Sequence, residues 1–176
     1  MKKSFVVVGF VMLVLSGCGD STRDLKAVDN FNLNKYAGKW YEIARLDNRF
    51  ERDLIGVTAF YKLGENDGEI EVINRGFNET NNTRQVARGT ARFVGKPDVG
   101  YLEVSFFWLF YSGYKILELD KEYEYALVTS DTFDYLWILA RDPVISDEIY
   151  QSLVDKAQKL GFNTSELIKI SHLCGC

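Results

Sequence analysis

Residues 38–45 read GKWYEIAR and raise the question that decides the fold: what does a tryptophan cover at the start of a strand? Gly38 suits a tight turn, and apolar and polar residues alternate from Trp40 onward. Such alternation is typical of a strand with one buried face. The ring of Trp40 covers either a filled core or one end of a hollow barrel, and the remaining sequence must distinguish the two.

Seven further segments with strand character follow this stretch at short and regular spacing. They lie at residues 56–63, 69–77, 84–94, 101–107, 114–120, 124–130 and 134–141. Hairpin-length loops join most of them, which predicts an all-β fold, either an antiparallel sandwich or an up-and-down barrel. Residues 167–171 are a candidate for one more short strand.

One amphipathic helix is predicted between Ser146 and Gly161. Ser146 is a good N-cap, Asp147 and Glu148 occupy the first turn, and Gly161 suits the position after the last turn. The apolar residues between them form a single stripe. We expect this helix to pack against the outside of the sheet.

Small residues suggest that the strands enclose space. Ala87, Gly89 and Ala91 share one face of the predicted strand 84–94. An eight-stranded barrel is just wide enough to be filled by side chains or to hold one small ligand. Small inward residues favour the cavity, although they also relieve crowding where a barrel bends.

The two ends of the strand pattern resemble the lipocalin family. GKWYEIAR contains the G-x-W motif of that family at Gly38 and Trp40, and DYLWILARDP (residues 134–143) ends in its arginine, Arg141. Within the family the chain looks most like the bacterial lipocalins, which are outer-membrane lipoproteins, and apolipoprotein D. The resemblance covers residues 31–173 and implies an eight-stranded antiparallel up-and-down β-barrel with one C-terminal helix outside.

The resemblance also implies a role for the opening motif. In lipocalins the tryptophan lies across the closed end of the barrel and the late arginine lies over its ring. A cation–π contact of this kind contributes ~0.5–2 kcal/mol. Gly38, Trp40 and Arg141 are therefore the expected floor of a cup, and the alternative is a tryptophan in a filled core.

The expected ligand site is the inward face of the barrel. Trp137 lines the cavity by resemblance to apolipoprotein D, and alternation places its neighbours on the same face. Two tyrosines after the fifth strand are expected at the entrance, with hydroxyls available to a polar head group. The complete set is Trp137, Tyr135, Val104, Phe106, Tyr111, Tyr114 and Ala91.

The segment FFWLFYSGY (residues 106–114) is unusually aromatic for a connection between strands. It either folds back on the rim of the barrel or forms an apolar lip that admits lipid, contacts a membrane or contacts a second subunit. A homodimer is therefore one of the expected possibilities.

The first residues form a separate segment. Lys2 and Lys3 precede an apolar run at residues 5–15, which is too short for a good membrane span and fits a secretory signal. The run ends in Leu-Ser-Gly-Cys18, which resembles the processing box of bacterial lipoproteins; the alternative is an ordinary signal with a chance cysteine. We expect a signal peptide at 1–17 and a lipid-anchored tether at 18–30.

Processing changes the charge of the chain. The full sequence has a formal net charge of −4, and loss of Lys2 and Lys3 brings it to −6. An acidic surface argues against nucleic acid as a partner. Gly19 rather than aspartate follows Cys18, which by resemblance to bacterial lipoproteins implies the outer membrane, with the domain facing the periplasm.

The residues that carry chemistry are few. His172, Cys174 and Cys176 stand at alternate positions, but the last residues (174–176) are expected to form a tail, and no fourth metal ligand accompanies them. Glu51 is expected on the solvated surface, and neither a metal nor a cofactor is expected.

The sequence therefore predicts a non-enzymatic protein that binds, stores or transports a hydrophobic ligand, namely a fatty acid or a lysophospholipid. The alternatives are an enzyme on a lipocalin scaffold that uses a thiol of the tail, and a tethered scaffold of the cell envelope without a ligand.

Overall fold

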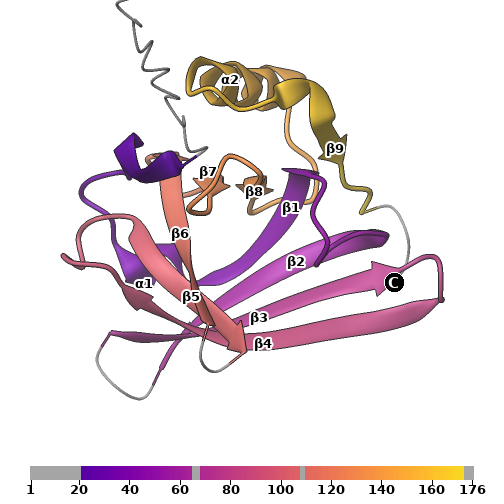
Figure 1. The fold of residues 1–176 in the computed structure, drawn as a ribbon, viewed down its shortest axis with the longest axis horizontal. Coiled ribbons are helices and arrows are strands. Elements are labelled where there is room, and N and C mark those ends of the chain that lie inside the picture. Colours follow the sequence, from indigo (N-terminus) through magenta and orange to yellow (C-terminus); the bar gives the residue numbers. More distant parts are fainter. Residues whose placement is uncertain (1–20, 65–67, 108–109, 173–176) are drawn as a thin grey trace, which may run out of the picture.

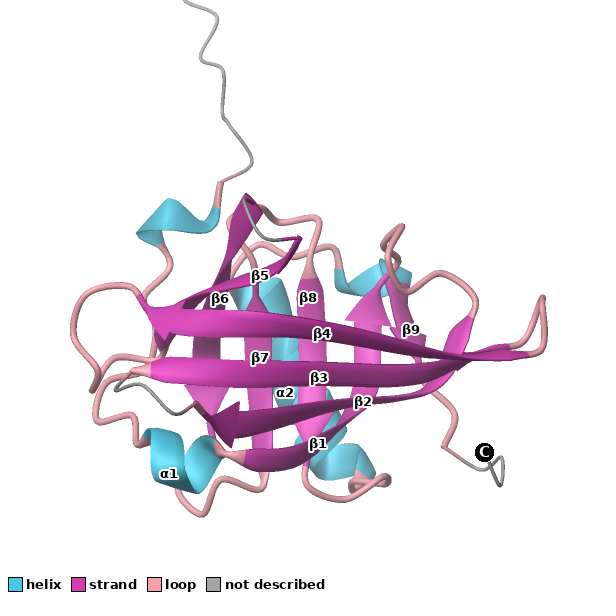
Figure 2. Ribbon diagram, turned by 90° about the horizontal axis from the view of Figure 1, so that it is seen from below, coloured by secondary structure: helices cyan, strands magenta, loops and turns pink. Residues whose placement is uncertain are grey.

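Eight consecutive antiparallel strands close into a barrel in the computed structural model, which describes residues 21–64, 68–107 and 110–172 (Figures 1 and 2). Closure is direct, because β1 pairs with both β2 and β8. The strands are β1 (Gly38–Leu46), β2 (Leu54–Leu63), β3 (Glu69–Asn78), β4 (Thr83–Phe93), β5 (Tyr101–Phe107), β6 (Phe110–Leu119), β7 (Tyr125–Thr129) and β8 (Leu136–Ala140). The predicted up-and-down barrel is confirmed.

The expected helix is α2 (Asp147–Lys159), and it lies outside the barrel (Figure 1). The Ser146 side chain accepts a hydrogen bond from the Ile149 amide and caps its first turn. Leu153 and Ala157 are fully buried against Leu127 and Ile138 of the barrel wall. No helix in the described part of the chain is long and apolar enough to cross a bilayer.

Four shorter elements complete the structure. The segment η1 (Thr22–Asp24) and the helix α1 (Leu33–Tyr36) precede the barrel, and η2 (Thr164–Glu166) follows α2. The strand β9 (Leu167–Lys169) is the short strand expected near the C-terminus, and it pairs with β1.

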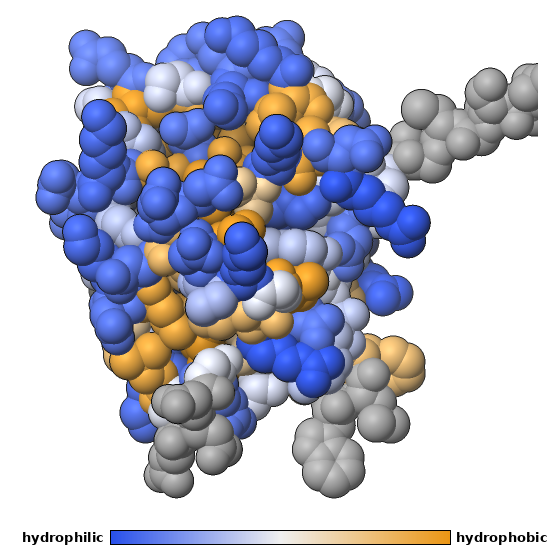
Figure 3. Space-filling model, turned by 90° about the vertical axis from the view of Figure 1, so that its left-hand side faces the viewer, coloured by the Kyte–Doolittle hydropathy of each residue, from blue (hydrophilic) through white to orange (hydrophobic). Residues whose placement is uncertain are grey.

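Alternation along the strands separates the inside of the barrel from its outside. In β4, Ala91 is buried whereas Thr90 and Arg92 are exposed. One hydrophobic core fills the closed half of the barrel around Trp40, and a second lies between the barrel wall and α2. On the side where α1 lies, hydrophilic side chains cover much of the surface (Figure 3).

The strand β6 begins earlier than the sequence suggested. Residues expected as a connection are strand from Phe110, and Ser112 and Gly113 pair with Val104 and Glu103 of β5. Gly113 does not mark a turn: a Cβ there would lie 2.1 Å from the Asp131 Oδ1 atom. Its amide instead donates to the Asp131 carboxylate (2.6 Å), so the glycine permits a close approach.

The described part of the expected tether is packed against the barrel. Thr22 is fully buried, and its amide donates to the Asp131 carbonyl in the β7–β8 loop. Further along, the Val28 amide donates to the Ile116 carbonyl of β6. Residues 21–30 therefore run along the barrel from the end where β7 stops to the end where β1 starts.

Candidate ligand-binding cavity

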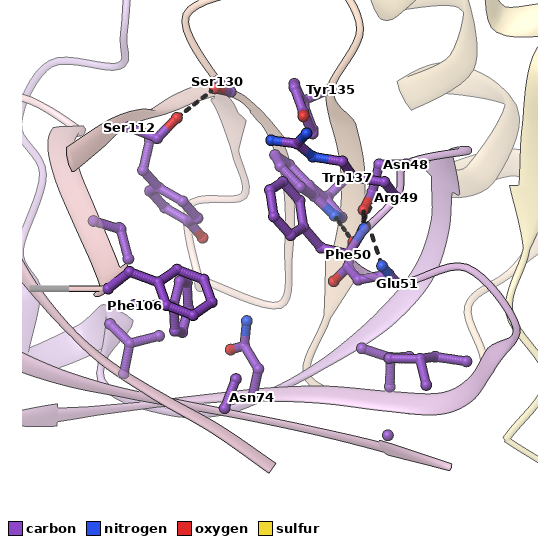
Figure 4. A pocket seen from close by; sticks show the side chains of 18 of the residues that line it. Asn48, Arg49, Phe50, Glu51, Asn74, Phe106, Ser112, Ser130, Tyr135 and Trp137 are labelled. Atoms are coloured by element: carbon purple, nitrogen blue, oxygen red, sulfur yellow. Dashed lines mark hydrogen bonds between the residues drawn. The ribbon is translucent and has the colours of Figure 1, made fainter. Parts of the chain in front are cut away.

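A cavity of about 550 Å³ occupies the half of the barrel opposite Trp40 (Figure 4). Its lining includes the loop between β1 and β2 and the facing ends of β5 and β6. Aromatic side chains form much of the wall, and both Phe106 and Trp137 turn into the space (Figure 4). The cavity is open at the end of the barrel that carries the β1–β2 loop and the β5–β6 hairpin, and we call this end the mouth.

Six of the seven residues expected at the ligand site line this cavity. They are Trp137, Tyr135, Val104, Phe106, Tyr111 and Tyr114. The seventh, Ala91, lies on β4 opposite Val104 and is buried in the hydrophobic core, outside the cavity wall. The alternation rule placed it on the correct face but did not show how deep the core extends.

The opposite end is closed by Trp40 and Arg141. The Trp40 ring is fully buried, and its Nε1 donates to the Tyr36 carbonyl (2.8 Å). The Arg141 guanidinium carbon lies 4.0 Å from the centre of that ring. Gly38 has a φ of +100°, and a Cβ there would lie 3.3 Å from the Arg141 Nη1. The G-x-W motif thus turns the chain and leaves room for the guanidinium.

Three tyrosine hydroxyls meet between the floor and the cavity. The Tyr114 hydroxyl lies 2.6 Å from that of Tyr36 and accepts from that of Tyr61 at 2.7 Å. Burial raises the pKa of all three phenols, so they are neutral. Three hydroxyl protons and two mutual hydrogen bonds leave at least one proton for another acceptor. That proton lies on the Tyr114 hydroxyl, which lines the cavity, when Tyr36 donates to Tyr114, and on the buried Tyr36 hydroxyl when Tyr114 donates.

A polar contact fixes the loop between β1 and β2 at the mouth. The Glu51 carboxylate accepts hydrogen bonds from Trp137 Nε1 (2.9 Å) and Asn48 Nδ2 (2.7 Å) (Figure 4). The Asn48 Oδ1 atom in turn accepts from the Phe50 and Glu51 amides. The expectation that Glu51 lies on the solvated surface is wrong. A loop residue has no periodicity that would have revealed this role.

A buried contact between a carboxyl and a guanidinium lies under the same loop. Arg45 Nη1 is 2.7 Å from Glu42 Oε1, and both side chains are almost fully buried. Arg45 also donates to the Glu51 carbonyl at 2.6 Å. Burial raises the pKa of the Glu42 carboxyl well above its usual value, and the negative charge of Glu51 raises it further. The positive charge of Arg45 lowers this pKa but does not cancel the increase.

Few polar groups face the cavity itself. Ser112 and Ser130 hydroxyls lie 3.1 Å apart on its wall. Asn74 also lines it, and its buried Oδ1 has no hydrogen-bond partner among the described residues (Figure 4). An apolar wall with a few placed polar groups is typical of sites for small hydrophobic ligands.

The described residues offer little reactive chemistry. They contain no group of three or more His, Cys, Asp or Glu side chains placed to hold a metal ion. His172 lies with Nε2 2.8 Å from the Glu42 carbonyl, and its ring meets the edge of Tyr41. Cys18, the expected site of lipid attachment, and the tail thiols of Cys174 and Cys176 lie outside the described residues.

The comparison with protein families agrees with this geometry. Residues 31–172 match the lipocalin-like domain family. The chain is a lipocalin. Membership of this family supports the binding of a hydrophobic ligand, which is the coarse function expected from the sequence. The sealed floor and the apolar interior of the barrel agree with it.

Sequence relatives of this lipocalin include bacterial lipoproteins and apolipoprotein D. It is 43% identical over 173 residues to the outer membrane lipoprotein Blc of Vibrio cholerae, covering 98% of this chain and 99% of that protein. The Blc protein of Escherichia coli K12 is 44% identical over 169 residues, 95% of each chain. These likenesses confirm the expected localisation as an outer-membrane lipoprotein. Bovine apolipoprotein D is 38% identical over 135 residues (72% of this chain and 69% of that protein).

Solved structures share the fold of this lipocalin. Lobster apocrustacyanin A1 superposes with a TM-score of 0.68 at 20% identity and 82% coverage of both chains. Insecticyanin from the tobacco hornworm gives 0.66 at 20% identity and 84% coverage of both. At such identities the likeness shows the fold alone.

Proposed function

We propose that this lipocalin binds a single-chain amphiphile, a fatty acid or a lysophospholipid, and stores or carries it on the periplasmic side of the outer membrane. In this proposal acyl groups on Cys18 anchor the chain. The observation that carries the proposal is the cavity of about 550 Å³, which is aromatic and apolar, open at the mouth and sealed by Trp40 and Arg141. Its volume lies within the range of roughly 300–1,000 Å³ that small-molecule sites occupy.

Transfer energies support an acyl chain as the buried part of the ligand. Each buried CH₂ contributes ~0.8 kcal/mol, so a sixteen-carbon chain gains about 12 kcal/mol in gross terms. Association costs an estimated 4–15 kcal/mol, and a chain that comes from a bilayer is already dry. The expected dissociation constant is therefore micromolar to nanomolar, and chain length should affect it more than the head group.

The polar groups of the site suggest how such a ligand lies. An acyl chain that enters first places its head group at the mouth, beside the hydroxyls of Ser112, Ser130 and Tyr135 and the guanidinium of Arg49. At the inner end the ligand meets the hydroxyls of Tyr61 and Tyr114, which already hydrogen-bond to each other.

Titration tests the proposal. Delipidated mature protein is titrated with fatty acids and lysophospholipids of increasing chain length, and the fluorescence of Trp137 in the cavity wall is followed. We expect saturable binding, with each added CH₂ tightening the dissociation constant by up to about four-fold, the equivalent of ~0.8 kcal/mol. Folded protein that shows no saturation at any chain length would contradict the proposal and favour a scaffold without a ligand.

A further inference from the structure

The N-terminal segment joins the barrel beside the mouth of the cavity. The Thr22 hydroxyl donates to the Ser130 carbonyl (2.6 Å), and Ser21 forms a β-bridge with Thr132. Ser130 directly follows β7 and lines the cavity, and its hydroxyl lies 3.1 Å from that of Ser112 in the neighbouring strand β6. Figures 1 and 2 both place η1 beside β6. The chain therefore enters the domain at the open end and not at the floor.

The distance from this entry point to the proposed anchor is short. Cys18 precedes Ser21 by three residues, and three fully extended residues span at most about 11 Å. Phe110 lies two residues beyond Ser112 toward the tip of the hairpin, about 7 Å along the strand. Phe110 and an acylated Cys18 can consequently reach the same plane, whereas the floor lies a barrel length away.

Exposed apolar side chains gather at the same end. Among the described residues, eight large hydrophobic side chains are exposed, and five of them line the cavity. Phe107, Phe110 and Phe50 are the most exposed of these, at 71%, 78% and 57%. Two separate loops present them, so they form an apolar rim around the mouth. Phenylalanine is among the residues that insert into the boundary between head groups and acyl chains when a protein lies on a bilayer.

The charges of the rim suit phospholipid head groups. Arg49 and Arg75 line the cavity and are exposed, and neither forms an ion pair with a described residue. The chain as a whole has a net charge of −4. The Arg49 guanidinium carbon lies 4.7 Å from the centre of the exposed Phe50 ring. Arginine is well shaped to bind phosphate, so this pair matches a surface of phosphates above acyl chains.

We infer that the mouth of the barrel rests on the phospholipid leaflet that holds the anchor, with Phe50, Phe107 and Phe110 at the lipid surface. This inference rests on the proposed anchor at Cys18. In this orientation a single-chain amphiphile passes between the leaflet and the cavity without crossing water, and the short link from Ser21 to Cys18 keeps the two together. The occupant of the rim is thus a bilayer surface and not a second copy of the chain.

Site-specific labels test this orientation. The acylated full chain, with Cys174 and Cys176 changed to serine, carries one fluorophore on Arg52→Cys beside the mouth or on Lys121→Cys in the β6–β7 turn at the floor. It is inserted into vesicles of phosphatidylethanolamine and phosphatidylglycerol that contain nitroxide-labelled phospholipid. We expect strong quenching of the label at position 52 and little or none at position 121. Equal quenching at both positions, or stronger quenching at position 121, would overturn the inference.

A rim variant and a matched control identify the surface responsible. Phe107→Ser with Phe110→Ser should reduce quenching of the label at position 52, whereas Val144→Ser should not, although Val144 is 72% exposed. Quenching that weakens as the protein becomes denser in the vesicle would assign the rim to a second copy and overturn the inference. No ligand is added in the quenching experiment. The orientation can therefore be refuted while the titration of the soluble domain shows binding, and it can be supported while the titration shows none.

Discussion

Arg141 joins several parts of the chain at the closed end of the barrel. It donates five hydrogen bonds to main-chain carbonyls, those of Tyr123, Lys39, Lys35, Tyr36 and Ala37. Its guanidinium also stacks over Trp40. The two residues that carry the family motifs therefore meet, and their roles in the fold are to seal one end and to tie α1 to the barrel.

This arrangement predicts a large effect for a single substitution. Trp40→Ala should destabilise the protein by roughly 3–5 kcal/mol, because a fully buried ring is removed and the Tyr36 carbonyl loses a donor. Trp40→Phe, which keeps most of the apolar contact, should cost less. Denaturant unfolding of the three proteins checks this, and an unchanged midpoint for Trp40→Ala would show that the ring covers nothing.

The buried Glu42 carboxyl predicts a dependence of stability on pH. Burial and Glu51 raise its pKa in the folded state, so above the usual glutamate range the folded protein keeps a proton that the unfolded chain has released. The free energy of unfolding should therefore decrease as the pH rises from about 5 until Glu42 ionises. Glu42→Gln keeps the shape of the side chain but cannot ionise, so it should flatten this decrease. Thermal unfolding of both proteins across this range is the measurement, and parallel curves would contradict the prediction.

The sequence could predict the residues of strands but not those of loops. Trp137 and Val104 line the cavity, the first as the resemblance implied and the second as alternation indicated. Glu51 was misplaced, since its role depends on a hydrogen bond to Trp137, which is 86 residues away along the chain. Asn48 and Phe50 belong to the same loop and were not found for the same reason.

The hairpin of β5 and β6 shows where the predicted bounds of a strand differ from the structure. The sequence places Ser112 and Gly113 in a connection between strands, but the structure has them within β6, which begins at Phe110. Asp131 explains the difference, because its carboxylate takes the place that a side chain at position 113 would occupy. A glycine required by a tertiary contact cannot be told from a turn glycine without the structure.

Gly89 in β4 gives a test at the level of the sheet. A Cβ at this position would lie 2.4 Å from the Ser105 carbonyl and 2.8 Å from the Phe106 ring. A main-chain atom cannot move aside as a side chain does, so Gly89→Ala should separate β4 from β5 and destabilise the protein by about 1–3 kcal/mol. Thr90→Ala, at the exposed neighbouring position, is the control. Equal stability of the two variants would mean that the small inward residues of β4 are not required for packing.

At the scale of the whole molecule, the chain divides the barrel into a filled half and a hollow half. The filled half contains Trp40 and the tyrosine cluster, and the hollow half lies at the end where the N-terminal segment joins. Strand spacing predicted an antiparallel sandwich or a barrel, the resemblance to lipocalins implied the barrel, and small residues suggested some space inside it. They gave no measure of the cavity and no indication that residues 21–30 pack against the wall, because both depend on contacts between distant segments.

Filling the hollow half separates ligand binding from folding. Val104 is buried in the cavity wall, between Ala91 of β4 and Ser112 of β6. Val104→Trp extends a large ring into the cavity, where it meets space and not a packed core, so we expect the barrel to fold and a long acyl chain to lose its place. Val144→Trp is the matched control, because the same side chain is added at an exposed position outside the cavity.

The expected results for this pair differ in binding and agree in stability. Titration with a sixteen-carbon fatty acid should give no saturable signal for Val104→Trp and an unchanged dissociation constant for Val144→Trp. Thermal unfolding should remain cooperative in both, since overpacking costs only about 1–3 kcal/mol even in a well-packed core. If Val104→Trp does not fold, Phe106→Trp places the added bulk nearer the mouth and serves the same purpose. Unchanged affinity in a folded Val104→Trp protein would place the ligand outside the barrel, for instance on the apolar rim, and the cavity would then have no part in binding.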